Sequence, residues 1–268
     1  MTFLDDVVPE IRRVIEQSGY GSGIPPTSSG PPPSLRQAVE RDRSAGALVV
    51  EYKRASPGQP DPVLPFRTVS EFLEATRAAP VTAYSCLATV PRFHGAPGDV
   101  AEMVRSTDRP VLFKDIVIDH RQVDVAARTG ASAVLLIARL EGQGRAVEPL
   151  SSLAEAAHRR GLEVVVEFHD RADLSRRADV AADVYGVNAR NLDTLSIDRA
   201  RADATLQEAH ALGLHPLLGM SGVEQPSDAR RFFESGADGI LVGGAVARAR
   251  SPNELLRSLR RDLSGGTG

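Results

Sequence analysis

Short apolar runs alternate with amphipathic stretches along the chain from residue 46 onward. Each run is rich in Val, Ile and Leu and is mostly continuous, which is typical of strands buried on both faces of a parallel sheet. The pattern predicts eight strands, over residues 46–53, 81–88, 110–115, 132–138, 162–168, 183–188, 216–221 and 239–244.

The stretches between these runs have the apolar spacing of helices, and several end in Gly, as helix C-termini prefer. The first of them, TVSEFLEATRAA, places Thr68 and Glu71 at the spacing of a capping box. Further helices are expected within residues 99–107, 119–130, 148–161, 226–236 and 251–263.

Eight strands, each followed by a helix, predict an α/β fold with a single (β/α)8 barrel. The alternative is a doubly wound sheet, which would need a Gly-rich turn after its first strand. That strand instead ends in Glu51-Tyr52-Lys53-Arg54. An amphipathic helix over about 4–17 and a Gly/Pro/Ser linker over 20–34, with no core of its own, precede the barrel. We expect three parts: the N-terminal extension 1–34, the barrel 35–263 and a flexible tail 264–268.

The composition narrows the class of protein. Hydrophobic residues make up 42% of the chain, charged residues 25%, and the net charge is −3, as in an ordinary globular protein. This balance argues against nucleic acid or an anionic membrane as the partner. The chain has no apolar run of transmembrane length and no basic, apolar signal peptide at its start. Its one cysteine, Cys86, excludes an internal disulfide and a Cys-based zinc site, and its apolar strand favours a core position. We expect a cytoplasmic monomer.

The rarity of lysine in this chain suggests that its lysines have a role in proton transfer. Of the 32 basic residues only two are Lys, Lys53 and Lys114, and the other 30 are Arg. Lysine can give and take a proton when burial moves its pKa, whereas arginine stays charged. Both lysines fall at predicted strand ends, and the active site of a barrel lies at the C-terminal ends of its strands. If the two lysines were ordinary surface residues, there would be no reason for both to fall at strand ends on the same face of the barrel.

Two carboxylates are predicted at the same barrel mouth. Glu51 lies two residues before Lys53 on one strand, so both side chains point the same way, and Glu167 ends the fifth strand. Two cations beside two carboxylates suit general acid–base catalysis, although a structural ion-pair network would have the same composition. His169 and Asp170 follow the fifth strand without a metal-like cluster, and Asp170 fits a helix N-cap. We expect no metal and no cofactor.

A phosphate site is expected where the seventh and eighth strands end. The sequences MSGV and VGGAVARA place Ser221, Gly222, Gly243 and Gly244 there. Glycines allow backbone N–H groups to approach an anion, and a short helix after the eighth strand would point its N-terminus at that anion. The alternative is that these glycines only form tight turns. Arg190, after the sixth strand, could add a bidentate contact.

Several of these segments together are similar to the indole-3-glycerol phosphate synthase family, whose members are (β/α)8 enzymes of tryptophan biosynthesis. The resemblance covers about residues 35–250 in order and spacing. It is carried by VVEYKRASPG, PRFHGAPGD, PVLFKDIVIDHRQV, GASAVLLIARL, LEVVVEFHD, VYGVNARNLDTLSID and GADGILVGGAVARA.

The resemblance implies a reaction without a cofactor. The family converts 1-(2-carboxyphenylamino)-1-deoxyribulose 5-phosphate to indole-3-glycerol phosphate, with loss of CO2 and water. The resemblance implies that Lys114 is the general acid in ring closure and that Lys53 binds the substrate and protonates the departing hydroxyl. Glu51 would act as the partner base of Lys53, and Glu167 would assist proton transfer on the opposite side. Asn188 would position these groups by a hydrogen bond to the substrate. Ser56, Arg190, Ser221, Gly222, Gly243 and Gly244 match positions around the phosphate, and Phe93 would lie near the anthranilate ring.

The sequence departs from the family pattern on the side that would face the substrate. Met220 stands where the family usually has Glu, Ile116 where it has an aromatic residue, and Ala88-Thr89 where it has Thr-Glu. The linker over 20–34 lies where the family's N-terminal segment helps to cover the site. Three interpretations therefore stay open: the family reaction, a paralogue that performs a related reaction on a modified phosphorylated amino-sugar, and a non-catalytic phosphate-binding barrel.

Overall fold

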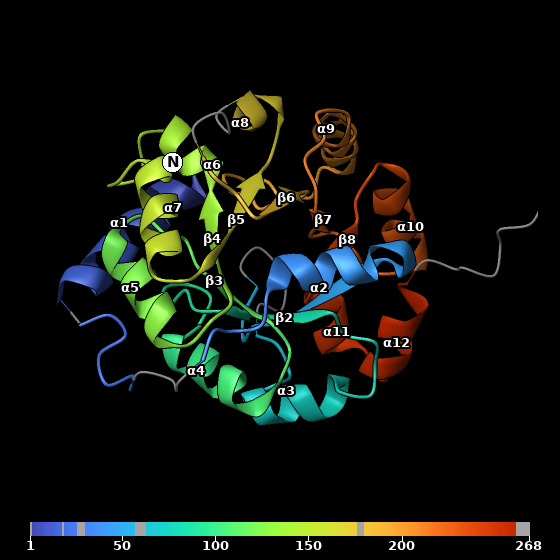
Figure 1. Cartoon of the computed structure of the whole chain (residues 1–268), viewed down its shortest axis with the longest axis horizontal. Helices are drawn as coiled ribbons and strands as arrows, with labels where there is room; N and C mark the ends of the chain where they lie inside the picture. The colour runs from blue at the N-terminus through green and yellow to red at the C-terminus, as the bar shows by residue number, and fades with distance from the viewer. Residues whose placement is uncertain (1, 18, 26–29, 57–62, 176–179, 261–268) are drawn as a thin grey trace, which may run out of the picture.

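A computed structural model describes residues 2–17, 19–25, 30–56, 63–175 and 180–260. Within these residues, eight parallel strands form one closed barrel in which each strand pairs with the next (Figure 1). The first strand also pairs with the last, Val49 with Leu241, which closes the sheet. The strands are β1 (Ala47–Tyr52), β2 (Ala83–Leu87), β3 (Val111–Lys114), β4 (Ala133–Ile137), β5 (Glu163–Phe168), β6 (Val184–Asn188), β7 (Leu217–Met220) and β8 (Gly239–Val242).

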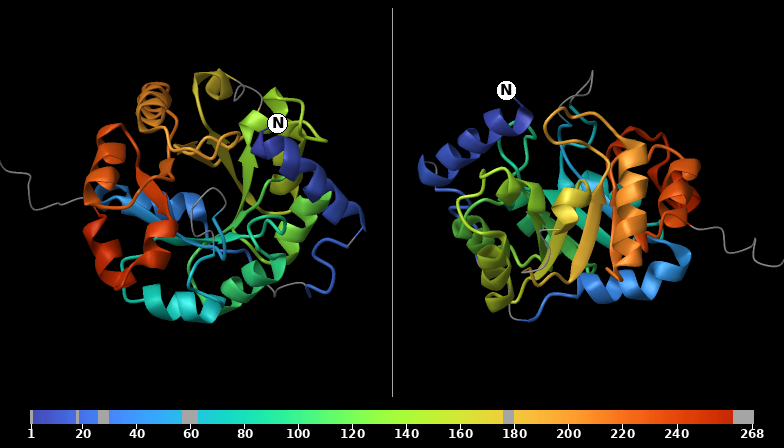
Figure 2. Two further views of the ribbon diagram at one scale, coloured as in Figure 1. Left: turned by 180° about the vertical axis from the view of Figure 1, so that it is seen from behind. Right: turned by 90° about the horizontal axis from the view of Figure 1, so that it is seen from above.

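Helices surround the barrel and cover its two ends (Figures 1 and 2). The long ones are α1 (Phe3–Gln17), α2 (Leu35–Asp42), α3 (Val69–Thr76), α4 (Pro97–Ser106), α5 (His120–Arg128), α7 (Leu150–Arg159), α9 (Arg199–Ala211), α10 (Pro226–Glu234) and α12 (Pro252–Ser258). Shorter turns of helix are η1 (Arg43–Ala45), α6 (Ala138–Gly142), α8 (Arg171–Ser175) and α11 (Gly244–Arg248). No helix of the described residues is long and apolar enough to cross a membrane.

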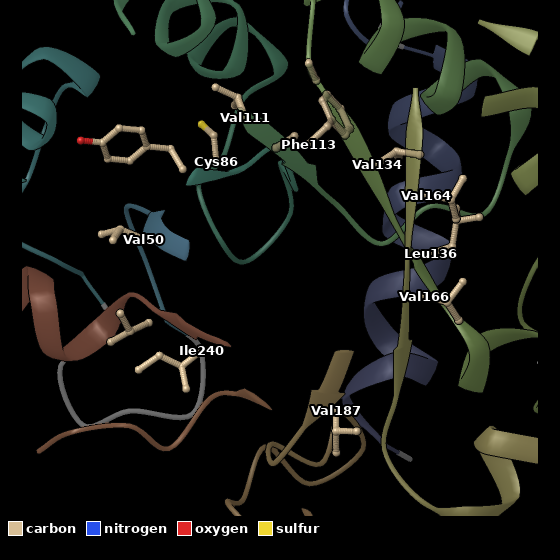
Figure 3. Packing of buried hydrophobic residues seen from close by; sticks show 14 of the residues in the cluster. Val50, Cys86, Val111, Phe113, Val134, Leu136, Val164, Val166, Val187 and Ile240 are labelled. Carbon is tan, nitrogen blue, oxygen red and sulfur yellow. The ribbon is translucent and has the colours of Figure 1, made fainter. Parts of the chain in front are cut away.

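Alternation along each strand divides the core into two layers. Outward-facing residues pack between the sheet and the helices, as Figure 3 shows for Val50, Phe113 and Val166. Inward-facing residues such as Val49 and Val165 fill the barrel itself. Each fully buried Val or Leu stabilises the fold by about 1.5–3 kcal/mol. The same alternation aims every second residue at the strand ends into the barrel mouth.

The two ends of the barrel are closed by different helices. Helix α2 crosses the amino-terminal end, where its N-cap Ser34 donates a hydrogen bond to Glu163 at the start of β5. Helix α1 lies over the loops at the carboxyl end. The N–H of Phe3 donates to the carbonyl of Asp193 after β6, and Glu10 pairs with Arg92 after β2 at 2.6 Å. The N-terminal extension is therefore part of the cover of the barrel mouth.

The expected elements agree closely with the structure. All eight strands lie within the predicted ranges, the N-terminal helix is confirmed, and Thr68 and Glu71 form the predicted capping box. Cys86 is fully buried in the outer core layer, where burial raises the pKa of its thiol well above the usual range. Helices α2, α6 and α9 were not predicted, whereas α8 begins directly after Asp170, the expected N-cap. The tail 264–268 and residues 26–29 of the linker lie outside the described residues.

The linker over 20–34 differs from its expectation at one end. Tyr20 and Ile24 pack against the core of the barrel. The hydroxyl of Tyr20 donates a hydrogen bond to Asp115, next to the end of β3. Burial and the Asp115 carboxylate raise the pKa of Tyr20 well above its usual value, so the phenol keeps its proton as a donor. This end of the linker is thus anchored to the barrel.

Candidate active site

The predicted acid–base residues lie in one layer at the carboxyl ends of the strands. Glu51 on β1, Lys114 on β3 and Glu167 on β5 come from alternate strands and all face the inside of the barrel. The Glu51 carboxylate lies between both lysines. Its Oε2 is 2.8 Å from Lys53 Nζ and its Oε1 is 3.4 Å from Lys114 Nζ. The only two lysines of the chain therefore share one carboxylate.

The charges in this layer fix one another's protonation. Burial on its own would raise the pKa of Glu51, but the ammonium groups of Lys53 and Lys114 outweigh it and lower that pKa to about 2. Burial would lower the pKa of Lys114, but the carboxylates of Glu51 and Glu167 outweigh it and raise that pKa. At neutral pH Glu51 is ionised and Lys114 carries its proton, which is the state that a general acid requires.

One pocket brings together all twelve predicted site residues. The lining includes Glu51, Lys53, Ser56, Phe93, Lys114, Glu167, Asn188, Arg190, Ser221, Gly222, Gly243 and Gly244. Phe93 is held at the rim by an edge-on contact with Phe3 of α1, at 5.8 Å between ring centres. Helix α1 therefore supports one aromatic wall of the pocket.

The end of β6 contributes a linked pair of polar residues. The Asn188 side-chain oxygen accepts the backbone N–H of Arg190 at 2.9 Å, which leaves the Asn188 amide N–H groups as donors. The Arg190 guanidinium donates to the carbonyl of Leu195 at 2.6 Å. Burial lowers the pKa of Arg190, an effect that Glu51 and Glu224 oppose. A half-buried cation with free donor positions beside the glycine loops suits an anion.

The turn after β7 and the glycines after β8 have different structural reasons, backbone conformation in the first case and close packing in the second. Ser221 and Gly222 both have positive φ angles, 64° and 73°, which form the turn after β7. A Cβ added at Gly243 would lie 2.6 Å from Glu51 Oε2, so only glycine leaves room for that carboxylate. A Cβ at Gly244 would lie 3.2 Å from both terminal nitrogens of Arg248. Helix α11, which begins at Gly244, has only five residues.

Two charged residues of the pocket were missed by the sequence analysis. Arg248 and Glu224 both line the pocket, and Arg248 Nη2 donates to both oxygens of the Glu224 carboxylate, at 3.0 and 3.1 Å. Arg248 is one of 30 arginines in the chain, so the presence of an arginine at this position did not mark it as a functional residue. The unusual Gly243-Gly244 pair was the available clue, because the absence of a side chain at 244 makes room for the Arg248 guanidinium.

Asp115, next to Lys114, is occupied by structural hydrogen bonds. Its oxygens accept from the Thr89 hydroxyl at 2.7 Å, the Gln122 amide at 3.0 Å, the Ile116 N–H at 2.8 Å and the Tyr20 hydroxyl. This carboxylate ties β3, α5, the loop after β2 and the N-terminal segment together. Thr89, which departs from the family pattern, is one of its donors.

The other two departures make part of the pocket apolar. Met220 and Ile116 are both buried, belong to the inner core layer and line the pocket. A thioether and an alkyl group can neither accept a charged hydrogen bond nor transfer a proton. Further apolar lining residues are Leu135, Ile137, Leu192 and Leu241. The pocket lining thus combines charged and apolar side chains.

His169 and Asp170 lie just beyond β5. Asp170 accepts the N–H of Asp173 at 3.1 Å and so caps α8, as predicted. His169 is fully buried behind Glu167 and does not line the pocket. The described residues contain no group of three or more His, Cys, Asp and Glu side chains arranged to hold a metal ion.

Comparison with known proteins supplies a family. A family model described as indole-3-glycerol phosphate synthase matches residues 20–259. The indole-3-glycerol phosphate synthase of Staphylococcus aureus (strain MRSA252) is 31% identical over 264 residues, which cover 97% of this chain and 98% of that protein. The synthase of Exiguobacterium sibiricum is 34% identical over 218 residues, which cover 80% of each chain.

Solved structures share the fold at much lower identity. An N-acetylmannosamine-6-phosphate 2-epimerase from Clostridium perfringens has a TM-score of 0.61 at 16% identity, over 83% of this chain and 94% of that one. A tryptophan synthase alpha subunit from Legionella pneumophila has a TM-score of 0.58 at 13% identity, over 84% and 96%. These likenesses show the barrel alone, because one barrel fold hosts many unrelated activities.

Proposed function

Because this chain belongs to the indole-3-glycerol phosphate synthase family, we propose that it converts 1-(2-carboxyphenylamino)-1-deoxyribulose 5-phosphate to indole-3-glycerol phosphate. The reaction loses CO2 and water and uses Lys/Glu acid–base catalysis without a cofactor. The observation that carries the proposal is the buried Glu51 carboxylate with Lys53 and Lys114 on either side of it. A barrel that only binds phosphate needs no such pair, since arginine holds phosphate at least as well.

Ring closure and dehydration divide the work between the lysines. Lys114 gives its proton to the substrate carbonyl oxygen while the aromatic carbon attacks the carbonyl carbon, and the carboxylate then leaves as CO2. Lys53 protonates the departing hydroxyl, which leaves as water. Glu51 holds both ammonium groups and takes the proton that the neighbouring ring carbon loses as the double bond forms. Glu167 assists proton transfer on the opposite side of the pocket, and solvent replaces the proton given to the carbonyl oxygen. Asn188 positions the substrate through its amide donors.

The remaining pocket residues fit the two ends of this substrate. Ser56, Arg190 and the glycine loops after β7 and β8 lie together and offer cationic and backbone donors for the phosphate. Phe93 and the apolar lining residues suit the anthranilate ring.

The deciding experiment is a fluorescence assay for indole-3-glycerol phosphate formed from the carboxyphenylamino-deoxyribulose phosphate by the purified protein. Robust turnover supports the family reaction and means that Met220 and Ile116 are tolerated. Absence of product from protein that still binds the substrate contradicts it.

A second candidate is a related reaction on a modified phosphorylated amino-sugar. It is favoured by one observation: Met220 and Ile116 replace polar or aromatic groups on the substrate-facing wall, while both lysines remain. This candidate predicts turnover of substrates with altered anthranilate-like rings and none of the family substrate. The same assay therefore separates the two.

A further inference from the structure

Glu167 has a buried partner behind it. His169 follows two residues later, just past the end of β5, and its imidazole is fully buried. The ring Nε2 lies 3.3 Å from Glu167 Oε1, and Nδ1 lies 3.3 Å from Asp173 Oδ2 on α8. Glu167 is 1% exposed. The three side chains thus form a buried row that leads from the pocket to the helix layer.

The far end of this row is fixed as an anion. Asp173 Oδ2 accepts the backbone N–H of His169 at 2.9 Å and lies 3.4 Å from Arg139 Nε. Burial would raise the pKa of Asp173, but His169 and Arg139 outweigh it and lower that pKa. Arg139 also pairs with Asp170, which holds the guanidinium in place. Because Asp173 is ionised, the ring nitrogen that faces it must carry a hydrogen.

The near end of the row then needs one more proton. With Nδ1 protonated, a neutral imidazole presents the lone pair of Nε2 to Glu167 Oε1. A lone pair 3.3 Å from an ionised carboxylate oxygen, both buried, is unfavourable. One proton between Nε2 and Oε1 removes the conflict, whether it is bonded to the oxygen or to the nitrogen.

We propose that His169 is a positioning residue that shares one proton with Glu167 and holds the Glu167 carboxylate towards the substrate. This inference rests on the role of Glu167 in the proposed function. The shared proton moves without net change: the Nε2–H bond breaks as the Oε1–H bond forms, and the reverse. Glu167 Oε2 accepts no hydrogen bond from another described residue, so it is available to the substrate.

The charges around the pair come from every side. Lys114 of β3 faces Glu167 from the pocket, and Asp173 of α8 faces His169. Arg139 of α6 lies behind Asp173 and also pairs with Asp170. The contacts of the imidazole with both carboxylates are at ion-pair distance without hydrogen-bond geometry. Catalytic hydrogen bonds of this kind are often loose in the absence of substrate and tighten when it binds.

A double-mutant cycle tests the proposal through Glu167. His169→Gln should lower kcat about 10-fold or more, because a positioned proton-transfer group contributes about 100-fold or more, while KM changes little. The pH–rate limb that depends on Glu167 should shift. In a Glu167→Gln background, His169→Gln should cause no further loss, since the two residues act as one unit. An equal loss in both backgrounds, or an unchanged kcat and pH profile, overturns the proposal.

A matched control uses the same substitution outside the pocket. His120 is partly buried and pairs with Glu148 at 3.1 Å, and neither residue lines the pocket. His120→Gln should leave kcat and the pH profile unchanged. If it lowered kcat as much as His169→Gln does, the effect of His169 would be general destabilisation, and the proposal would be wrong.

A measurement on the protein without turnover separates this inference from the proposed function. In protein labelled with ¹⁵N in histidine, the buried ring should show a slowly exchanging Nδ1–H, and Glu167→Gln should change the Nε2 chemical shift. This holds whether or not indole-3-glycerol phosphate is formed, and it does not require His169→Gln to fold. If the Nε2 chemical shift of the buried ring does not change in Glu167→Gln, the proposal of a shared proton is wrong.

Discussion

The terminal methyl group of Met220 lies against Gly186 on the neighbouring strand. A Cβ added at Gly186 would stand 2.2 Å from Met220 Cε and 3.1 Å from its Sδ. Met220 is 1% exposed, so its side chain fills the barrel interior between β6 and β7. Met220, at the position where the resemblance implies a carboxylate, is thus built into the core, and Gly186 provides the space for it.

This packing predicts coupled effects on stability. Gly186→Ala should destabilise the protein because its methyl group collides with Met220. Met220→Ala should cost about 2–5 kcal/mol of unfolding free energy through the cavity that it leaves. The double variant should lose less than the sum, because the new methyl group occupies part of that cavity. Urea denaturation of the four proteins measures the coupling, and strictly additive losses would contradict the packing described.

Lys114→Arg tests the general acid. The substitution keeps the positive charge beside Glu51 but offers no proton near neutral pH. We expect turnover to fall by about 100-fold or more, while the affinity for inorganic phosphate, measured by calorimetry, changes little. Full turnover by the variant would show that the proton comes from another group.

The pair of Lys53 with Glu51 predicts a pH dependence of stability. The pKa of Glu51 is lowered to about 2 in the folded protein, below the ordinary glutamate value of 4.5. Ionisation of Glu51 therefore stabilises the fold above about pH 4.5, and this stabilisation is lost as pH falls through about 2. Lys53→Met removes a cation that lowers the pKa, so the variant should be less stable at pH 7.

The difference in unfolding free energy between wild type and Lys53→Met should shrink as the pH falls from about 4.5 towards 2. Denaturation at a series of pH values measures it. Glu51→Gln serves as the background control, because without an ionisable group at 51 this pH dependence should vanish. A difference that stays constant with pH would mean that Lys53 stabilises the fold by packing alone.

The ion pair of Arg248 with Glu224 predicts opposite effects of two neutral variants. Arg248→Gln should raise KM for the phosphorylated substrate about 10-fold, the cost of one charge-assisted hydrogen bond. Glu224→Gln should lower KM, because it releases the guanidinium from a competing carboxylate. Arg250→Gln, two residues further along and outside this pocket, should have no effect. Steady-state kinetics decide, and equal effects of all three would exclude a specific phosphate contact.

The strands were predictable because burial on both faces leaves continuous apolar runs. Helix α9 was not, because it buries mainly small or polar residues, Ala202, Thr205 and Ala209, and so has no clear apolar stripe. Helix α2 follows a Pro-rich segment and has only three buried residues, Leu35, Ala38 and Val39. For α9 tertiary contacts, and not an apolar stripe, stabilise the helix. In α2 the local signal is present but short, because Ser34 caps the helix and its three buried residues have helical spacing.

The candidate site also has a part that the sequence predicts and a part that it does not. Glu51, Lys53, Lys114 and Glu167 were predictable because the barrel fold fixes which ends of the strands meet. The pairing of Arg248 with Glu224 and the contact of Tyr20 with Asp115 join segments far apart in the sequence. No spacing rule along one chain predicts such contacts, since they depend on loop paths over the barrel mouth.

Strand register decides the chemistry of this barrel. On β3, Phe113 packs in the outer layer and its neighbour Lys114 faces the pocket. A slip of one residue would exchange the two, because successive side chains point to opposite faces. A slip of two residues would keep the lysine inside but move it by about 7 Å along the strand, away from Glu51. The register of the strands therefore decides which side chains reach the pocket. Single-residue insertions within β1, β3 or β5 should reduce activity far more than insertions in the loops that follow these strands.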